Sequence, residues 1–208
     1  MKDYDLVIVG TGPAGMSAAL FAEGDGLKFR LVEREEPCGF VEEVINTNFT
    51  NLENYLGLYN INGTEIANIF RRHMKSRQIQ IHKEDIQKIL IQGDSFKVES
   101  DGQPYKTRSL ILATGTSPRE LTVDGLEGIP KRIHYGMNGD FSEYSGKIVL
   151  VVGGRNSGAV TAVRLREFGA NPIIIEKSMK PTAKEKYLEK ILSLSIPYFL
   201  NSTLEGVA

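Results

Sequence analysis

Apolar runs and helix-like patterns follow one another in the same order near both ends of the chain. In each case a short apolar run, a stretch with apolar residues at helical spacing and a second apolar run occur in succession. The strand, helix and strand are expected over 5–9, 16–22 and 29–33, and again over 147–152, 157–168 and 172–176. Each series is typical of a βαβ unit with parallel strands.

Shorter elements are expected between and after these units. Residues 34–62 are polar and irregular, and a helix is expected over 64–76. Brief strands follow over 79–81, 86–91, 96–99 and 105–107, a further strand over 109–113, a late helix over 183–194 and a last strand over 198–200. The four brief strands predict an antiparallel meander, and the strand over 109–113 is expected to return to the parallel sheet. Thr182 and Glu185 have the spacing of a capping box for the late helix.

The chain is therefore predicted to have an α/β fold with two Rossmann-like βαβ dinucleotide-binding units, the first with an inserted antiparallel β-meander. We expect a first domain over 1–115 and a second over 147–208. Residues 116–146 are rich in glycine, proline and charge, and we interpret them as a crossover linker.

Composition narrows the class of protein. The net charge of −1 gives no reason to expect nucleic acid or a membrane surface as a partner. No apolar run approaches the ~20 residues that span a bilayer. Met1 to Asp5 lead directly into the first strand, which leaves no room for a signal peptide, and one cysteine excludes an internal disulfide. A cytoplasmic location is the expectation.

The first glycine turn has the composition of a phosphate-binding turn. Gly10 allows a tight turn, Gly12 lets the backbone approach a pyrophosphate, and Gly15 lets helix and strand pack closely. The pyrophosphate is expected at the helix N-terminus, beside Pro13 and Ala14. Glu33 ends the second strand, where it can accept a hydrogen bond from a ribose hydroxyl.

A second turn repeats this motif with the same spacing, from Gly153 to Glu176 as from Gly10 to Glu33. Its candidate binding residues are Gly153, Gly154, Arg155, Asn156, Ser157, Gly158 and Glu176. Arg155 stands where the middle glycine is expected, so its side chain projects toward a pyrophosphate. Two such units suggest two dinucleotides, and hence electron transfer between a nicotinamide and a second carrier, typically a flavin.

Four segments together resemble the thioredoxin-reductase-like branch of the FAD- and NAD(P)-dependent (pyridine nucleotide-disulfide) oxidoreductases. They are Gly10 to Gly15, Glu53 to Gly57 followed by Asn62 to Ile66, Ile111 to Gly115, and Val152 to Gly158. The resemblance implies that the first domain binds FAD and the second NADH or NADPH. It adds candidate flavin-site residues at Gly39, Asn54, Ala113, Thr114 and Gly115. It also implies a homodimer.

Two departures from the family pattern concern completeness. The family's Cys-x-x-Cys lies just before the second turn, where this chain has Tyr135 to Asp140 instead. The resemblance also implies a C-terminal return to the FAD domain, which the 208 residues do not contain. We therefore expect both domains to be incomplete, either as part of a longer product or as a short protein completed by a partner.

A third departure concerns the nucleotide. Glu176 suits a free ribose 2′-hydroxyl and repels a 2′-phosphate, which favours NADH over NADPH. Lys177 beside it softens that preference. Arg155 leaves two interpretations open, a site that has decayed and a site in which the guanidinium binds the pyrophosphate.

Few residues outside the turns are candidates for chemistry. Cys38 and His134 are weak catalytic candidates, and no spacing of His, Cys and carboxylates predicts a metal site. The predicted function is hydride transfer from NAD(P)H to FAD and then to a quinone, oxygen or a ferredoxin-like protein, without an internal dithiol. The alternatives are a non-catalytic nucleotide-binding module completed by a partner chain and an enzyme similar to ferredoxin–NAD(P) reductase.

Overall fold

The computed structural model describes residues 2–39, 41, 52, 55–117, 119–129, 133–135 and 141–207. These residues form two compact units, one that ends at Ser117 and one that contains the later residues. Each unit is described by itself.

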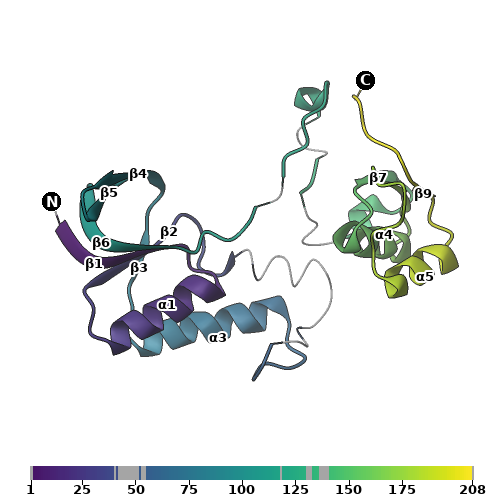
Figure 1. Cartoon of the computed structure of the whole chain (residues 1–208). Helices are drawn as coiled ribbons and strands as arrows, with labels where there is room; N and C mark the ends of the chain where they lie inside the picture. Colours follow the sequence, from purple (N-terminus) through teal and green to yellow (C-terminus); the bar gives the residue numbers. More distant parts are fainter. Residues whose placement is uncertain are drawn as a thin grey trace. The chain divides into compact units, whose positions relative to one another are not determined.

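The first unit is an α/β unit with helices on one face of its sheet (Figure 1). Its elements are β1 (Lys2–Val9), α1 (Pro13–Gly24), β2 (Phe29–Glu33), α3 (Gly63–Ser76), β3 (Ile81–Lys83), β4 (Ile86–Gln92), β5 (Ser95–Ser100) and β6 (Tyr105–Leu112). The strand order is β3–β2–β1–β6–β5–β4. β3, β2, β1 and β6 are parallel neighbours, whereas β4, β5 and β6 pair antiparallel.

Alternation along β1 separates two apolar clusters. Leu6 and Ile8 pack with residues of α1 and α3, among them Met16 and Ala67. Val7 lies on the opposite face, with Val98 and Tyr105 of the meander. Because successive side chains of a strand point to opposite faces, one strand contributes to both clusters.

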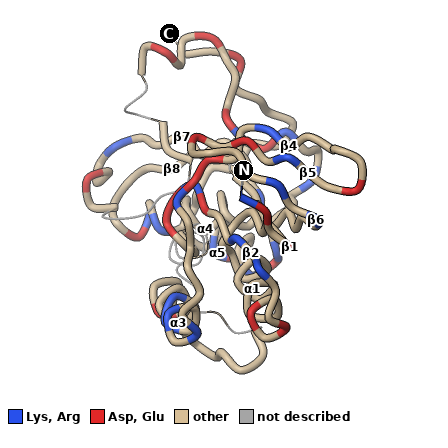
Figure 2. The backbone as a smooth tube through the Cα atoms, turned by 90° about the vertical axis from the view of Figure 1, so that its left-hand side faces the viewer, with Lys and Arg blue, Asp and Glu red and all other residues tan. Residues whose placement is uncertain are grey.

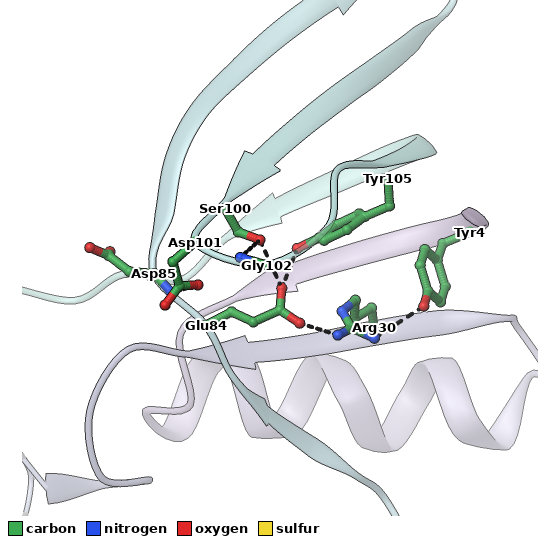
Figure 3. A network of polar contacts seen from close by, with 8 residues as sticks. All are labelled: Tyr4, Arg30, Glu84, Asp85, Ser100, Asp101, Gly102 and Tyr105. Atoms are coloured by element: carbon green, nitrogen blue, oxygen red, sulfur yellow. Dashed lines mark hydrogen bonds and ion pairs between the residues drawn. The ribbon is translucent and has the colours of Figure 1, made fainter. Parts of the chain in front are cut away.

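A polar network joins the meander to the parallel strands (Figure 3). Glu84, just after β3, forms an ion pair with Arg30 of β2 and accepts hydrogen bonds from the hydroxyls of Ser100 and Tyr105, both at 3.3 Å. Arg30 also donates to the Tyr4 hydroxyl at 3.1 Å. Burial, followed by the negative charge of Glu84, raises the pKa of Tyr105, so its hydroxyl stays protonated.

Figure 2 shows basic residues on α3, and the second half of this helix carries Arg71, Arg72 and Lys75. Positive charge near a helix C-terminus is favourable because it offsets the negative end of the helix dipole. At the other end, Asn62 and Glu65 form a capping box in which each side chain accepts from the other's backbone N–H, at 2.9 and 3.0 Å. The boundaries of α3 thus have local causes.

The second unit is a smaller βαβ unit. Among its described residues, the regular elements are the 3₁₀ helices η1 (Leu126–Gly128) and η3 (Phe141–Tyr144), followed by β7 (Ile148–Val152), α4 (Asn156–Glu167), β8 (Asn171–Ile175), α5 (Glu185–Ser193) and β9 (Tyr198–Phe199). The strands β7, β8 and β9 are parallel neighbours in that order. α4 and α5 cover one face, where Val151 and Ile174 are buried.

The predicted α/β fold with two Rossmann-like units and an inserted meander is confirmed. Two predictions about the meander were wrong. The strands expected over 105–107 and 109–113 are one strand, β6, because its pairing with β1 extends from Tyr105 to Leu112. The strand expected over 79–81 is β3, which pairs in parallel with β2.

The capping box predicted from Thr182 and Glu185 was also wrong. α5 begins at Glu185, and Lys184 is its N-cap without a side-chain hydrogen bond. The Lys184 N–H instead donates to the Asn156 side chain at 2.8 Å, and Asn156 is the first residue of α4. A contact between the two helices therefore fixes the start of α5.

Candidate dinucleotide-binding sites

The first glycine turn connects β1 to α1 with very little space around it. Gly10 has φ +102°, and a Cβ there would lie 2.3 Å from the Ala113 carbonyl oxygen. A Cβ on Gly15 would lie 1.9 Å from the Gly10 carbonyl oxygen. By contrast, a Cβ on Gly12 would meet nothing within 4 Å. The turn is packed against the sheet and α1, and it is open at Gly12.

Glu33 is turned back onto this turn. Its Oε2 accepts from the Thr11 N–H at 2.8 Å and from the Thr11 hydroxyl at 2.7 Å, and its Oε1 accepts from the Glu35 N–H at 3.1 Å. Partial burial alone would raise the pKa of Glu33, but the hydrogen bonds from Thr11, Glu35 and Arg34 outweigh it and lower the pKa. The carboxylate is ionised at neutral pH.

The other predicted residues of the first site are distributed around this turn. Pro13 is the first residue of α1, Ala14 is exposed, and no side chain caps the helix. Ala113 lies against Gly10, while Thr114 and Gly115 follow it as exposed residues. Asn54 lies outside the described residues.

Cys38 lies in the core behind the turn. It has φ +60°, and it is 3% exposed within the cluster that includes Met16. Its Sγ donates to the Thr11 carbonyl oxygen at 3.3 Å and lies 3.7 Å from the Met16 Sδ. Gly39, the next residue, is half-buried, and its N–H donates to the Glu36 carbonyl at 2.9 Å. The Cys38 thiol is thus in contact with the turn and shielded from solvent.

The second turn reproduces the backbone of the first. Gly153 has φ +98°, and a Cβ on Gly158 would lie 1.9 Å from the Gly153 carbonyl oxygen. Arg155 has φ −72° and ψ −174°, while Gly12 has φ −69° and ψ −178°. These values belong to extended backbone that any residue adopts, so the arginine fits the turn without distorting it.

Glu176 holds the second turn as Glu33 holds the first. Its Oε2 accepts from the Gly154 N–H at 2.8 Å, and its Oε1 accepts from the N–H and hydroxyl of Ser178, both at 2.9 Å. Burial alone would raise the pKa of Glu176, but the hydrogen bonds from Ser178 and Gly154 outweigh it and lower the pKa. Glu176 is 4% exposed, so its charge lies almost entirely inside the unit.

The remaining second-site candidates differ in their surroundings. Asn156 contacts the start of α5, as described above, and Ser157 is exposed. Arg155 is exposed, and its side chain forms no hydrogen bond or ion pair with the described part of the chain. It is therefore available to an anion in front of α4.

Sequence reasoning did not find the contacts of Thr11, Ser178 and Tyr198. The Tyr198 hydroxyl donates to the Gly154 carbonyl oxygen at 2.9 Å, and a Cβ on Gly154 would lie 2.3 Å from the tyrosine ring. Tyr198 follows the turn by 44 residues, and no local pattern connects them. Ser178 stands only two residues after Glu176, so its contact with that carboxylate is local and could have been considered from the sequence.

His134 lies apart from these contacts. Its Nε2 is 3.0 Å from the Tyr144 hydroxyl, and the two rings meet edge to face. Among the described residues, no group of three or more His, Cys, Asp or Glu side chains could hold a metal ion. Over the same residues, no helix is long and apolar enough to cross a membrane.

The chain has two strand–turn–helix units whose turns have matching torsions, and in each unit a carboxylate is held on the turn. This arrangement defines a protein with two Rossmann-like units. A family model described as pyridine nucleotide-disulphide oxidoreductase matches residues 7–205. The chain belongs to this family.

Individual proteins agree with this assignment. The chain is 34% identical over 178 residues to a 34.2 kDa protein in the rubredoxin operon of Clostridium pasteurianum, covering 85% of this chain and 56% of that protein. It is 32% identical over 185 residues to the thioredoxin reductase of Bacillus subtilis, covering 88% and 57%. The crystal structure of thioredoxin reductase from T. acidophilum matches with a TM-score of 0.82 and 31% identity, covering 100% of this chain and 67% of that one. The chain thus spans somewhat more than half the length of these two curated relatives.

Proposed function

We propose that this chain is the nucleotide-binding part of an FAD-dependent NAD(P)H oxidoreductase, with FAD at the first turn and the nicotinamide nucleotide at the second. The observation that carries the proposal is the matching backbone of the two turns, each followed by a helix whose first turn has no side-chain cap. Helix N-termini of this kind favour anions, because N–H groups and the positive end of the helix dipole point toward the ligand.

The residues around the first turn fit FAD. The space beside Gly12 is open to the approach of a pyrophosphate. Glu33 is ionised and already accepts hydrogen bonds from Thr11 and Glu35, and a ribose hydroxyl would donate to the same carboxylate. Ala113, Thr114 and Gly115 would complete this side of the site. A bound flavin would supply the redox chemistry, since it accepts a hydride and passes electrons on.

The second turn fits a nicotinamide nucleotide held in part by Arg155. Its backbone torsions match those of Gly12, so the substitution does not deform the turn. The exposed guanidinium presents a planar set of donors that suits phosphate oxygens. This favours a working site over a decayed one.

The charge of Glu176 supports a preference for NADH. The carboxylate is held ionised at the end of β8 and keeps about one acceptor position for a ribose hydroxyl. A 2′-phosphate at the same place would be repelled by this charge, and the exposed Lys177 offsets the repulsion only in part.

The electron acceptor lies outside this chain. The 208 residues contain one cysteine, Cys38, so they hold no dithiol that could relay electrons from a flavin. A quinone, oxygen or a ferredoxin-like protein would receive them, the last in the manner of a ferredoxin–NAD(P) reductase. Because the chain spans 56% and 57% of the two curated relatives described above, a binding module completed by a partner chain is the second candidate.

An anaerobic absorption experiment on the full 208-residue chain tests the proposal. The purified chain, supplied with FAD, should retain a stoichiometric flavin that NADH bleaches. A chain that retains FAD, but whose flavin NADH does not bleach and which shows no turnover with artificial acceptors, would favour the binding module. A chain that takes up no FAD would exclude both.

The role of Arg155 is tested separately by NADH titration. Arg155→Gly removes a charge-assisted contact and should weaken binding about tenfold or more. Arg155→Lys should recover part of the loss, because it restores the charge without the planar fork. Tighter binding by Arg155→Gly would mean that the arginine obstructs a decayed site.

A further inference from the structure

The second residue of each turn is held at both of its backbone groups. In the first turn, the Thr11 N–H donates to Glu33 at 2.8 Å, and the Thr11 carbonyl accepts from the Cys38 thiol at 3.3 Å. In the second turn, the Gly154 N–H donates to Glu176 at 2.8 Å, and its carbonyl accepts from the Tyr198 hydroxyl at 2.9 Å. The acids belong to the recognised motif, whereas the thiol and the phenol do not.

Holding a carbonyl fixes the N–H on the far side of the same peptide group. A trans peptide is planar, and its C=O and N–H point in opposite directions. The Thr11 carbonyl shares a peptide with the Gly12 N–H, and the Gly154 carbonyl shares one with the Arg155 N–H. No described residue accepts a hydrogen bond from either of these N–H groups. Each of these two N–H groups therefore points to the side of the turn opposite the carbonyl that is held.

The two side-chain donors reach equivalent carbonyls from different elements. Cys38 follows β2, while Tyr198 opens β9. The described acceptors near the Cys38 thiol include the Thr11 carbonyl and the Met16 thioether, and the carbonyl is the stronger of these two, which favours an S–H hydrogen bond to the turn. The Tyr198 ring also packs where a Cβ on Gly154 would stand. This contact explains why residue 154 is glycine while its counterpart is Thr11.

We propose that Cys38 and Tyr198 are positioning residues that aim the Gly12 and Arg155 N–H groups at the pyrophosphate of the nucleotide in each site. The inference rests on the proposed function, because it assumes that each turn binds a dinucleotide. Neither side chain needs to touch the ligand. Each acts through the peptide whose carbonyl it holds.

The state of Tyr198 agrees with this role. Burial, and after it the negative charge of Glu176, raises the pKa of the Tyr198 hydroxyl. The phenol therefore remains a donor throughout the neutral range.

Nucleotide titrations of the full chain test the proposal at each site. Tyr198→Phe keeps the ring against Gly154 and removes only the hydroxyl, so NADH should bind about tenfold more weakly while FAD binding is unchanged. Tyr187→Phe is the matched control, because Tyr187 packs against the same core and its hydroxyl forms no hydrogen bond with the turn in the described part of the chain. Cys38→Ala should weaken FAD binding by about fivefold and leave NADH binding unchanged, and Cys38→Ser should restore most of the loss.

Amide hydrogen exchange of the nucleotide-free chain separates this inference from the proposed function. Tyr198→Phe should speed exchange at Arg155 and Gly154, and Cys38→Ala should do so at Gly12 and Thr11. If the wild-type chain binds neither nucleotide, the proposed function is wrong. The positioning role of Cys38 and Tyr198 is then wrong as well, whatever the exchange rates are, because there is no nucleotide for the N–H groups to bind. If the wild type binds both and these variants bind and exchange as it does, the inference is wrong and the proposed function stands.

Discussion

Replacing Gly15 with alanine is the sharpest test of how the first turn is built. The added Cβ would lie 1.9 Å from the Gly10 carbonyl oxygen and 3.0 Å from its carbonyl carbon. Both are backbone atoms, so no side chain can rotate to make room. Ordinary contact begins near 3.4 Å, so α1 must move away from the turn by more than 1 Å.

The expected cost follows from two opposing contributions. Overpacking of a tight site costs about 3 kcal/mol at the upper end of its usual range. Alanine in place of glycine inside a helix recovers about 1 kcal/mol. The net loss of unfolding free energy should be about 2 kcal/mol, which lowers Tm by about 8 °C for a unit of this size.

Thermal and urea unfolding of the nucleotide-free chain measure this loss. Gly12→Ala is the matched control, because its Cβ meets nothing within 4 Å and its backbone is extended. That variant should unfold within about 1 kcal/mol of wild type while FAD binding weakens. A Gly15→Ala chain as stable as wild type would refute the close approach of α1 to the turn.

Three further predictions concern charges and a helix cap. The folded-state pKa values of Glu33 and Glu176 lie below the ordinary 4.5. The stability that these two carboxylates contribute is therefore present above about pH 4.5 and is lost as pH falls through the lower folded values. Urea unfolding at pH 3 to 7 should show this loss of stability, and the loss should be smaller in Glu176→Gln. Glu84→Gln leaves a half-buried arginine unpaired and should cost about 2–3 kcal/mol in urea unfolding, whereas Glu35→Gln, in an exposed pair, should cost under about 0.5 kcal/mol. Asn62→Ala removes the cap of α3 and should cost about 1 kcal/mol, and an unchanged urea midpoint would contradict the capping role.

The sequence was sufficient to predict the structure where one short segment determines its own geometry. Gly10 could be assigned to a tight turn and Gly15 to a close approach because the positive φ of Gly10 and the contact of Gly15 with the Gly10 carbonyl act within a few residues. The contact of Gly10 with Ala113, which is distant in the chain, was not predicted. The βαβ order could be predicted for the same reason, since hydrophobic period and glycine position are local signals. The spacing of the motif indicated that Glu33 ends the second strand, but it did not indicate that the carboxylate accepts hydrogen bonds from Thr11.

Prediction failed where the decisive partner is distant in the chain. The start of α5 depends on Asn156, which precedes it by 28 residues. β6 continues through polar positions because its neighbours β1 and β5 supply the pairing, and hydrophobic pattern alone divided it in two. In both cases tertiary contacts override a local preference.

The positions that differ between the two turns say more about what distinguishes the two nucleotide sites than the positions that match. The turn torsions, the contact of the last glycine with the carbonyl of the first (Gly15 with Gly10, Gly158 with Gly153) and the acid on the turn N–H are shared, so these features follow from the strand–turn–helix geometry itself. Thr11 against Gly154, Gly12 against Arg155 and Cys38 against Tyr198 are not shared. A thiol and a phenol reach the same carbonyl from unrelated elements, which suggests that orientation of this peptide is a requirement that each unit meets separately. The side chains that distinguish one nucleotide site from the other are therefore to be sought at these three pairs of positions.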